Sequence, residues 1–236
     1  MVSLKDLDAI FFDLDDTLFD ATSLAEKARR AAIEAMIENG LNGITPEQGY
    51  EILKEIVNEF GSNYDGHFNM LLKRLNASSS KLISQAIITY HRIKVQEIHL
   101  YPDVFGFLQN EKQHPGCKLG IITDGLPIKQ WEKIIRLGLD MFFPFVFISD
   151  EIGIRKPNPK LYAWACEKAS SSVARSLYVG DRFDQDIAPA KQAGLLTCFL
   201  HRGGKHDKVL SDKEKIMVDF EVKDLNELWL LLSSNA

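Results

Sequence analysis

The stretch Ala9-Ile10-Phe11-Phe12-Asp13-Leu14-Asp15-Asp16-Thr17 decides the fold of this chain. Its apolar part predicts a strand within residues 7–14 that is buried on both faces. Two carboxylates, Asp13 and Asp15, follow at alternate positions, which on an extended backbone directs both side chains to the same side. Acids at the end of a buried strand contradict the local pattern, and such contradictions mark functional sites. We therefore expect Asp13 and Asp15 to form the reactive centre.

The charge balance of the chain limits its partners. The 236 residues carry a net charge of −5, and 45% of them are apolar and 26% charged, as in an ordinary globular protein. This length allows one large domain or a core domain with an insertion. The negative charge argues against general binding to nucleic acid or to an anionic membrane. It does not exclude an anionic substrate, because one metal ion or lysine can dominate the charge of a single site.

The cysteines and residues 1–6 indicate the cellular compartment of the protein. Cys117, Cys166 and Cys198 are odd in number, have no CxxC spacing and lie beside apolar residues. We expect buried free thiols and a reducing environment. Residues 1–6 contain no apolar signal core and no segment has the length of a membrane span, so a cytoplasmic protein is expected. No sequence feature indicates the oligomeric state.

Residues 20–99 have the pattern of a helical subdomain. They contain helix-forming segments that are separated by glycine and proline signals, and no convincing strand. Helices are expected at residues 21–39, 46–60, 67–75 and 81–97. Because this block directly follows the first strand, we expect it to be an insertion into another fold.

From Tyr101 onward, strands and helices alternate. Helices are expected at residues 102–112, 127–137, 159–168, 184–193 and 226–232, and strands at residues 118–123, 145–149, 176–179 and 196–200. Such alternation predicts an α/β fold with a doubly wound, Rossmann-like parallel sheet. The first strand is expected to belong to the same sheet.

Polar residues that follow these strands form one predicted site. Asp13 and Asp15 follow the first strand, Thr123 ends the second, Lys156 lies in the loop after the third, and Asp181 follows the fourth. Ligands of such sheets bind beyond the carboxyl ends of the strands. The sequence therefore predicts acids, a hydroxyl group and a lysine at one edge of the sheet.

Four motifs carry a resemblance to a known family. They are Asp13-Leu14-Asp15-Asp16-Thr17, Ile121-Ile122-Thr123-Asp124-Gly125, Arg155-Lys156-Pro157 and Val179-Gly180-Asp181-Arg182-Phe183-Asp184-Gln185-Asp186-Ile187. In this order and at these strand ends, they resemble the haloacid dehalogenase (HAD) superfamily over nearly the whole chain. The helical insertion is similar to a C1 cap, so the resemblance implies a core of residues 1–19 and 100–236 and a cap of residues 20–99. In detail, the chain resembles small-metabolite phosphatases in which Thr-Asp-Gly replaces the commoner Thr-Asn-Gly.

The resemblance implies a chemical role for each motif residue. Asp13 is expected to attack phosphorus and form an aspartyl-phosphate. Asp15 is expected to protonate the leaving oxygen and then to accept a proton from water. Lys156 would offset negative charge on the nucleophile and the phosphate. Thr123 would bind the phosphoryl oxygens, and Asp124 and Lys156 are assigned to substrate binding with it.

The same resemblance implies a magnesium site. Asp13, Asp181 and Asp186 would repel one another and the incoming phosphate, and their oxygen ligands favour Mg²⁺. The family pattern assigns to the metal the Asp13 carboxylate, the Asp15 backbone carbonyl and Asp181. Asp186 is expected beside them, where it holds a water ligand of the metal or Lys156.

Simpler roles are expected for several other residues. Asp16 is expected to cap or orient its loop, and Asp184 to be a helix N-cap. His67, in a glycine-flanked loop of the helical block, is expected to pack in that loop, with contact to the substrate as the alternative. Residues 202–206, Arg-Gly-Gly-Lys-His, lack the context of a P-loop and are expected to form a surface turn.

The expected function is Mg²⁺-dependent hydrolysis of a small phosphorylated metabolite of the sugar- or triose-phosphate class, with glyceraldehyde 3-phosphate as one candidate. Three alternatives use the same fold. A phosphomutase would use the same residues and yield an isomerised phosphosugar. A 2-haloacid dehalogenase lacks an acid at the position of Asp15 and would release halide without Mg²⁺. A non-catalytic regulator would be inactive on a broad panel of phosphate esters.

Overall fold

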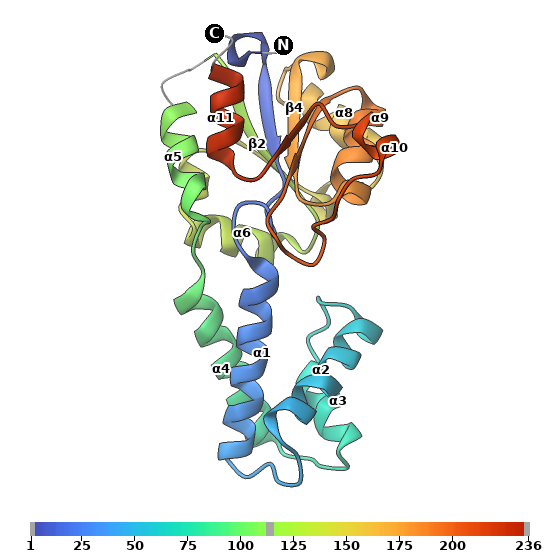
Figure 1. Ribbon diagram of the computed structural model, residues 1–236. Coiled ribbons are helices and arrows are strands. Elements are labelled where there is room, and N and C mark those ends of the chain that lie inside the picture. Colours follow the sequence, from blue (N-terminus) through green and yellow to red (C-terminus); the bar gives the residue numbers. More distant parts are fainter. Residues whose placement is uncertain (1–2, 112–115, 234–236) are drawn as a thin grey trace. The chain divides into compact units, whose positions relative to one another are not determined.

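The computed structural model describes residues 3–111 and 116–233. The chain divides into two compact units, one formed by Met1–Asp20 with His99–Ala236 and the other by Ala21–Ile98. The first unit, which we call the core unit, contains strands and helices (Figure 1). The second, which we call the helical unit, contains helices α1 to α4.

A six-stranded parallel sheet forms the centre of the core unit, in the order β3-β2-β1-β4-β5-β6. The strands are β1 (Ala9–Phe12), β2 (Lys118–Thr123), β3 (Phe145–Ile148), β4 (Ser176–Gly180), β5 (Leu196–Leu200) and β6 (Phe220–Val222). From β1 the chain adds β2 and β3 on one side of the sheet, and it then adds β4, β5 and β6 on the other side of β1. Ligands of such sheets bind at this switch point between β1 and β4, beyond the carboxyl ends of the strands. The predicted α/β fold with a parallel sheet is confirmed.

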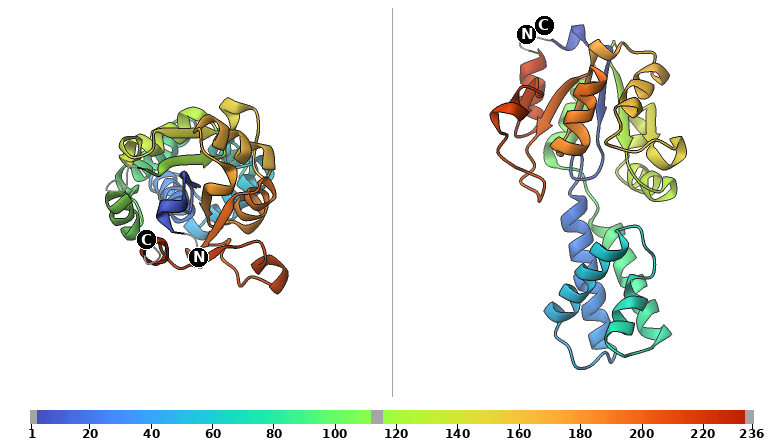
Figure 2. Two further views of the ribbon diagram at one scale, coloured as in Figure 1. Left: turned by 90° about the horizontal axis from the view of Figure 1, so that it is seen from above. Right: turned by 90° about the vertical axis from the view of Figure 1, so that its right-hand side faces the viewer.

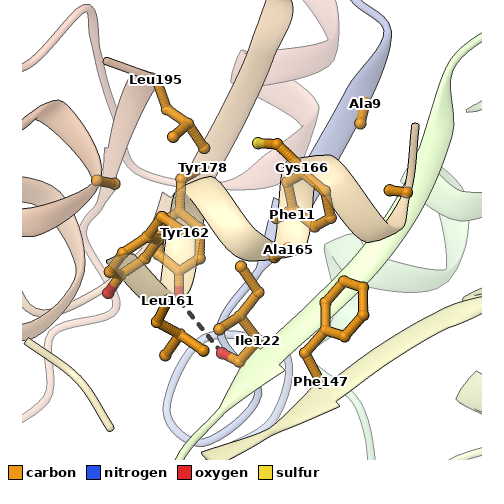
Figure 3. Close-up of a cluster of buried hydrophobic side chains, with 12 residues drawn as sticks. Ala9, Phe11, Ile122, Phe147, Leu161, Tyr162, Ala165, Cys166, Tyr178 and Leu195 are labelled. Carbon is orange, nitrogen blue, oxygen red and sulfur yellow. Dashed lines mark hydrogen bonds between the residues drawn. The ribbon is translucent and has the colours of Figure 1, made fainter. Parts of the chain in front are cut away.

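Helices cover both faces of this sheet. Helices α5 (Pro102–Glu111) and α11 (Leu225–Ser233) lie on one face, and α8 (Pro159–Lys168) and α9 (Ala188–Ala193) on the other (Figures 1 and 2). Neighbouring side chains of β1 point to opposite faces of the sheet, and helices cover both faces, so all four residues of β1 are fully buried. Phe12 packs edge-on against Phe107 of α5. Phe11 lies in the opposite cluster with Ala165 of α8 (Figure 3).

The remaining elements connect the sheet and its helices. They are α6 (Pro127–Arg136), α7 (Ser149–Ile152), α10 (Asp212–Lys215), a π-helical turn at Phe183–Ile187, and 3₁₀ turns at Leu4–Asp6, Leu139–Met141 and Val173–Arg175. The short elements α7, α10 and β6 were not predicted. The expected strand at residues 7–14 is shorter, because a 3₁₀ turn precedes it and the chain leaves the sheet after Phe12. The helix expected at residues 184–193 begins only at Ala188, as α9 (Ala188–Ala193), because the π-helical turn takes up its first residues. The other ends agree or differ by one residue, and Lys112 lies outside the described residues.

The helical unit is built from α1 (Ala21–Glu38), α2 (Pro46–Phe60), α3 (His67–Arg74) and α4 (Ser80–Glu97). The helical unit has an apolar core of its own, which includes Ile33, Leu53 and Leu71. Thr45 forms a capping box with Gln48 at the start of α2, with Oγ1 accepting from the Gln48 N–H at 3.2 Å.

An aromatic loop joins α2 and α3 in this unit. The rings of Phe60 and Tyr64 stack with centroids 4.9 Å apart, and Tyr64 meets His67 edge-on at 5.4 Å. His67 Nε2 lies 3.0 Å from the Gly61 carbonyl oxygen. These contacts agree with the expectation that His67 packs within its loop.

Two further predictions concern the whole chain. Cys117, Cys166 and Cys198 are buried and form no disulfide, which confirms the expected free thiols. Within residues 3–111 and 116–233, no helix combines the length and the apolarity that a membrane span requires.

Candidate active site

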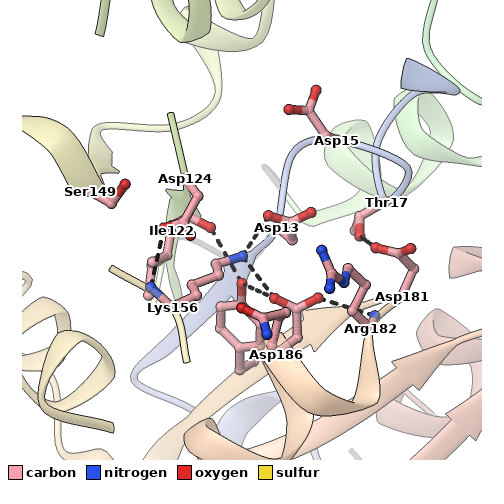
Figure 4. Close-up of polar contacts among 12 residues, drawn as sticks. Asp13, Asp15, Thr17, Ile122, Asp124, Ser149, Lys156, Asp181, Arg182 and Asp186 are labelled. Carbon is pink, nitrogen blue, oxygen red and sulfur yellow. Dashed lines mark hydrogen bonds and ion pairs between the residues drawn. The ribbon is translucent and has the colours of Figure 1, made fainter. Parts of the chain in front are cut away.

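A buried lysine joins two acids at the carboxyl edge of the sheet. Lys156, from the loop between α7 and α8, places Nζ 2.5 Å from Asp13 Oδ1 and 2.7 Å from Asp186 Oδ1 (Figure 4). Asp181 follows β4 and lies in the same group of side chains. The four residues are buried. The structure thus brings together Asp13, Lys156, Asp181 and Asp186, which come from three of the four sequence motifs.

Local structure holds Asp186 in this group. Its Oδ1 accepts a hydrogen bond from the Tyr178 hydroxyl at 3.1 Å, and its Oδ2 accepts one from the Arg182 N–H at 3.1 Å. A Cβ atom at Gly180 would lie 2.6 Å from the Asp186 carboxyl group. Only glycine at the end of β4 therefore allows Asp186 to approach the strand this closely.

Burial and mutual repulsion shift the titration of these groups. Burial raises the pKa of Asp13 well above its ordinary value; Lys156 lowers it, whereas Asp186 and Asp181 raise it further. Burial also raises the pKa of Asp181 to about 7, with Asp186 adding to the rise. Burial opposes the charge of Lys156, but Asp13 and Asp186 outweigh it and raise the pKa of the lysine well above its ordinary value. Three ionised carboxylates at this site would therefore carry more negative charge than one lysine balances.

This excess of negative charge suits a divalent cation. Asp13, Asp181 and Asp186 each offer a carboxylate oxygen, and these oxygens lie within 4.8 Å of one another. Such a set of hard oxygen donors fits Mg²⁺. The Thr17 hydroxyl donates a 3.0 Å hydrogen bond to Asp181 Oδ1, which fixes one of these carboxylates.

The segment after β2 forms the side of the site next to Lys156. Thr123 is buried at the end of the strand. Asp124 Oδ1 accepts a hydrogen bond from the Lys156 backbone N–H at 3.2 Å, and the Gly125 N–H donates to Ser149 Oγ at 3.2 Å. The Asp124 carboxylate therefore binds the lysine loop directly.

Asp15 lies apart from the buried cluster. Its carboxylate points away from Asp13 (Figure 4) and accepts hydrogen bonds from Lys133 Nζ of α6 at 2.7 and 2.6 Å. The expectation that Asp13 and Asp15 point to the same side is wrong, because β1 ends at Phe12 and its alternation does not extend through the loop.

Three other expectations concern residues near this edge. Asp184 is not a helix N-cap: it lies inside the turn Phe183–Ile187, whose N-cap is Arg182. The expected surface turn is present at residues 203–206, where Gly203, Gly204 and Lys205 are exposed, but the Arg202 side chain turns inward: it is 7% exposed and binds both Asp103 carboxylate oxygens at 2.9 and 2.8 Å and the Thr17 carbonyl at 3.0 Å. The backbone of Asp16 turns the loop, with φ of 61° and a 2.9 Å hydrogen bond to the Phe19 carbonyl.

Sequence reasoning missed three residues that support the site. Thr17 belongs to the first motif, and its place two residues after Asp15 was an available signal. Tyr178 and Lys133 had no such signal: a tyrosine in a buried strand suggests packing, and a lysine on an amphipathic helix suggests a solvated face.

Comparisons with known proteins agree with this arrangement. Residues 7–194 match the family model of haloacid dehalogenase-like hydrolases. The chain belongs to this family. It is 44% identical over 222 residues to a glyceraldehyde 3-phosphate phosphatase of Methanopyrus kandleri, covering 93% of this chain and 94% of the relative. A glyceraldehyde 3-phosphate phosphatase of Methanocaldococcus jannaschii is 42% identical over 220 residues, covering 93% and 94%.

A solved structure of a HAD hydrolase has a similar fold. The magnesium-bound HAD hydrolase YfnB of Bacillus subtilis has a TM-score of 0.66 and 25% identity, covering 96% of this chain and 98% of that one. The predictions of a HAD-like hydrolase, and of a phosphatase acting on a small phosphorylated metabolite, are confirmed by the family match and these relatives.

Proposed function

We propose that this HAD hydrolase is a Mg²⁺-dependent phosphatase of glyceraldehyde 3-phosphate that works through an aspartyl-phosphate on Asp13. The observation that carries the proposal is the buried contact of Lys156 with Asp13 and Asp186, beside Asp181. A carboxylate that is held by a cation at the edge of a sheet is suited to attack on phosphorus.

The first step transfers the phosphoryl group to the enzyme. An oxygen of Asp13 forms a bond to phosphorus, and the bond between phosphorus and the ester oxygen breaks with its electron pair on that oxygen. Asp15 donates a proton to the leaving oxygen, so the alcohol departs uncharged. Lys156, bound to Asp13, offsets the negative charge that gathers around phosphorus.

The second step regenerates the enzyme. A water oxygen attacks phosphorus of the aspartyl-phosphate while the Asp15 carboxylate takes a proton from that water. The bond between phosphorus and the Asp13 oxygen breaks, which releases inorganic phosphate and restores the carboxylate. Asp15 is again protonated, so the groups return to their starting state.

Four residues would hold the metal ion. Asp13, Asp181 and Asp186 supply carboxylate oxygens, and the Asp15 backbone supplies a carbonyl. When bound, Mg²⁺ neutralises charge on the phosphate and these acids. The related YfnB structure is bound to magnesium, which supports Mg²⁺ as the metal of this site.

We assign the segment after β2 to phosphate binding and positioning. The Thr123 hydroxyl binds a phosphoryl oxygen, and Asp124 positions Lys156 through the backbone of the lysine loop. In this proposal Asp124 serves substrate binding indirectly, through Lys156.

The proposed substrate rests on the relatives. Two proteins that match this chain over more than nine-tenths of its length, at 44% and 42% identity, are glyceraldehyde 3-phosphate phosphatases. A compact triose phosphate agrees with the small polar metabolite expected from the sequence. We assign residues 1–19 and 100–236 to the catalytic domain and residues 20–99 to its cap.

A phosphate-release assay tests the proposal. The purified protein is given glyceraldehyde 3-phosphate, other triose and sugar phosphates, phosphoglycolate and nucleotides, with Mg²⁺ or with EDTA. We expect the highest kcat/KM for glyceraldehyde 3-phosphate with Mg²⁺ and no release with EDTA. A higher kcat/KM for another ester contradicts the substrate, and an isomerised phosphosugar in place of free phosphate indicates a mutase.

A further inference from the structure

The carboxylate of Asp15 is bound by a cation that belongs to none of the four motifs. Lys133 Nζ lies 2.7 Å from Asp15 Oδ1 and 2.6 Å from Asp15 Oδ2. The side chains of Lys133 and Asp15 are 16% and 33% exposed, respectively. Arg136 and Glu132, an ion pair on the same helix, are 38% and 49% exposed. The Lys133 contact is therefore better shielded from solvent than an ordinary surface ion pair.

The lysine is itself held by the segment after β2. Lys133 Nζ donates to Gln130 Oε1 at 2.9 Å, and Gln130 Nε2 donates to the Asp124 carbonyl at 2.5 Å. A Cβ atom at Gly125 would lie 2.6 Å from Gln130 Nε2, so a glycine is required for this approach. A continuous chain of contacts thus links the second motif to Asp15.

Asp15 depends on such a partner because its own backbone segment is a loop. The chain leaves β1 at Phe12 and turns at Asp16, where φ is 61°. A one-third exposed carboxylate in this loop could adopt several rotamers without a contact to hold it. Lys156, the other lysine of the site, is engaged by Asp13 and Asp186.

The direction in which Asp15 points agrees with in-line phosphoryl transfer. The attacking and leaving oxygens stand on opposite sides of phosphorus. The leaving oxygen therefore lies beyond the phosphoryl group as seen from Asp13. A proton carrier for that oxygen has to stand away from Asp13, as the Asp15 carboxylate does (Figure 4).

We infer that Lys133 is a positioning residue for the proton carrier: it holds the Asp15 carboxylate away from Asp13, on the side where the leaving oxygen departs, and Gln130 fixes the lysine. This inference rests on the proposed phosphatase function. In this arrangement Lys156 holds the nucleophile Asp13, and Lys133 holds the proton carrier Asp15.

The leaving group of the substrate provides the test. An alkoxide, as from glyceraldehyde 3-phosphate, needs a proton when it departs, whereas p-nitrophenolate is a stable anion that needs little help. We expect Lys133→Met to lower kcat for glyceraldehyde 3-phosphate at least about tenfold, a part of the ~10²–10⁴-fold that positioned proton transfer supplies. For p-nitrophenyl phosphate the loss should stay below about threefold, because little proton transfer is involved.

Matched variants separate positioning from folding. Lys133→Arg keeps a cation and should restore most of the activity on glyceraldehyde 3-phosphate. Arg136→Met removes a cation of the same helix that pairs with Glu132 and should leave both activities unchanged. Because the Lys133–Asp15 ion pair is only partly shielded from solvent, the Lys133 variants should melt close to the wild-type temperature, since partly exposed ion pairs contribute little to stability.

A double variant shows whether the lysine acts through Asp15. In an Asp15→Asn background, Lys133→Met should cause no further loss on glyceraldehyde 3-phosphate. Equal losses on both substrates in Lys133→Met, an unchanged kcat, or an additive double variant would each overturn the inference while leaving the phosphatase activity intact. A wild-type protein that releases phosphate from neither ester would overturn the proposed function and this inference with it.

Discussion

Lys156 Nζ lies 2.5 Å from Asp13 Oδ1 in the buried interior of the core unit. Lys156→Met would leave Asp13, Asp181 and Asp186 without their shared cation. We expect phosphate release to be lost and the free energy of unfolding to fall by about 3–5 kcal/mol, as for other broken buried ion pairs. Phosphate assays and denaturant titrations measure the two effects. Lys160→Met, on the exposed start of α8, is the control and should behave as the wild type.

The nucleophile can be tested with a nearly isosteric change. Asp13→Asn keeps the shape of the side chain but cannot form an aspartyl-phosphate, so we expect turnover to fall more than about 10³-fold. The change also removes a negative charge from a crowded site, so the melting temperature in EDTA should not fall. A variant that retains even a tenth of the wild-type turnover would exclude Asp13 as the nucleophile.

Tyr178 supports Asp186 and gives a finer test. Tyr178→Phe removes the hydroxyl that donates to Asp186 Oδ1 at 3.1 Å and keeps the buried ring. We expect kcat to fall about tenfold, since a hydrogen bond to a charged group is lost and Asp186 becomes less fixed. Tyr162→Phe is the matched control, because the Tyr162 hydroxyl donates to the Gln185 backbone oxygen and not to a carboxylate of the site. Equal kcat values for the two variants would contradict a special role for Tyr178.

Thr17 is expected to affect the metal more than the chemistry. Thr17→Val removes the 3.0 Å hydrogen bond to Asp181 Oδ1 without changing the size of the side chain. Loss of a group that orients a metal ligand weakens metal binding about 10–100-fold. We therefore expect the half-saturating Mg²⁺ concentration to rise by about this factor, with kcat at saturating Mg²⁺ much less affected. Calorimetric titration of Mg²⁺ checks the affinity without an activity assay, and an unchanged affinity would contradict the assigned role.

The main features of the fold and the acids of the site follow from rules that act locally. Buried parallel strands need apolar runs, so β1, β2 and β5 were visible as such runs in the sequence. Acids directly after β1 and β4 have to meet at one edge, because these strands are parallel neighbours. This is why the proximity of Asp13, Asp181 and Lys156 could be predicted from the sequence.

The remainder depends on tertiary packing that no local pattern records. β6 has three residues and needs only one apolar side chain toward the core, so it resembles a loop in the sequence. The direction of Asp15 is set by Lys133, a residue 118 positions away that looks like any other exposed helix lysine. Asp184 was expected to cap a helix, but the chain starts a π-helical turn one residue earlier, at Phe183.

A buried acid far from the site predicts how stability depends on pH. Glu111, at the end of α5, is 3% exposed, and its Oε1 has no hydrogen-bond partner among the residues that the structure describes. Burial raises the pKa of Glu111 from 4.5 to about 7. In the unfolded chain the carboxyl group ionises near its ordinary pKa, whereas the folded protein holds the proton until about pH 7.

The folded state binds the Glu111 proton more tightly than the unfolded state does. The contribution of this proton to the free energy of unfolding is therefore complete below pH 4.5 and is lost as the pH rises to about 7. The total loss is about 3–4 kcal/mol, since each of the roughly 2.5 pH units between 4.5 and 7 contributes about 1.4 kcal/mol. Glu111→Gln cannot ionise, so its stability relative to the wild type should increase by this amount between pH 4.5 and pH 8. Denaturant titrations at both pH values measure the difference. Glu167→Gln, at an exposed position of α8, should keep the wild-type pH dependence, and a Glu111→Gln variant that does the same would show that Glu111 does not cause it.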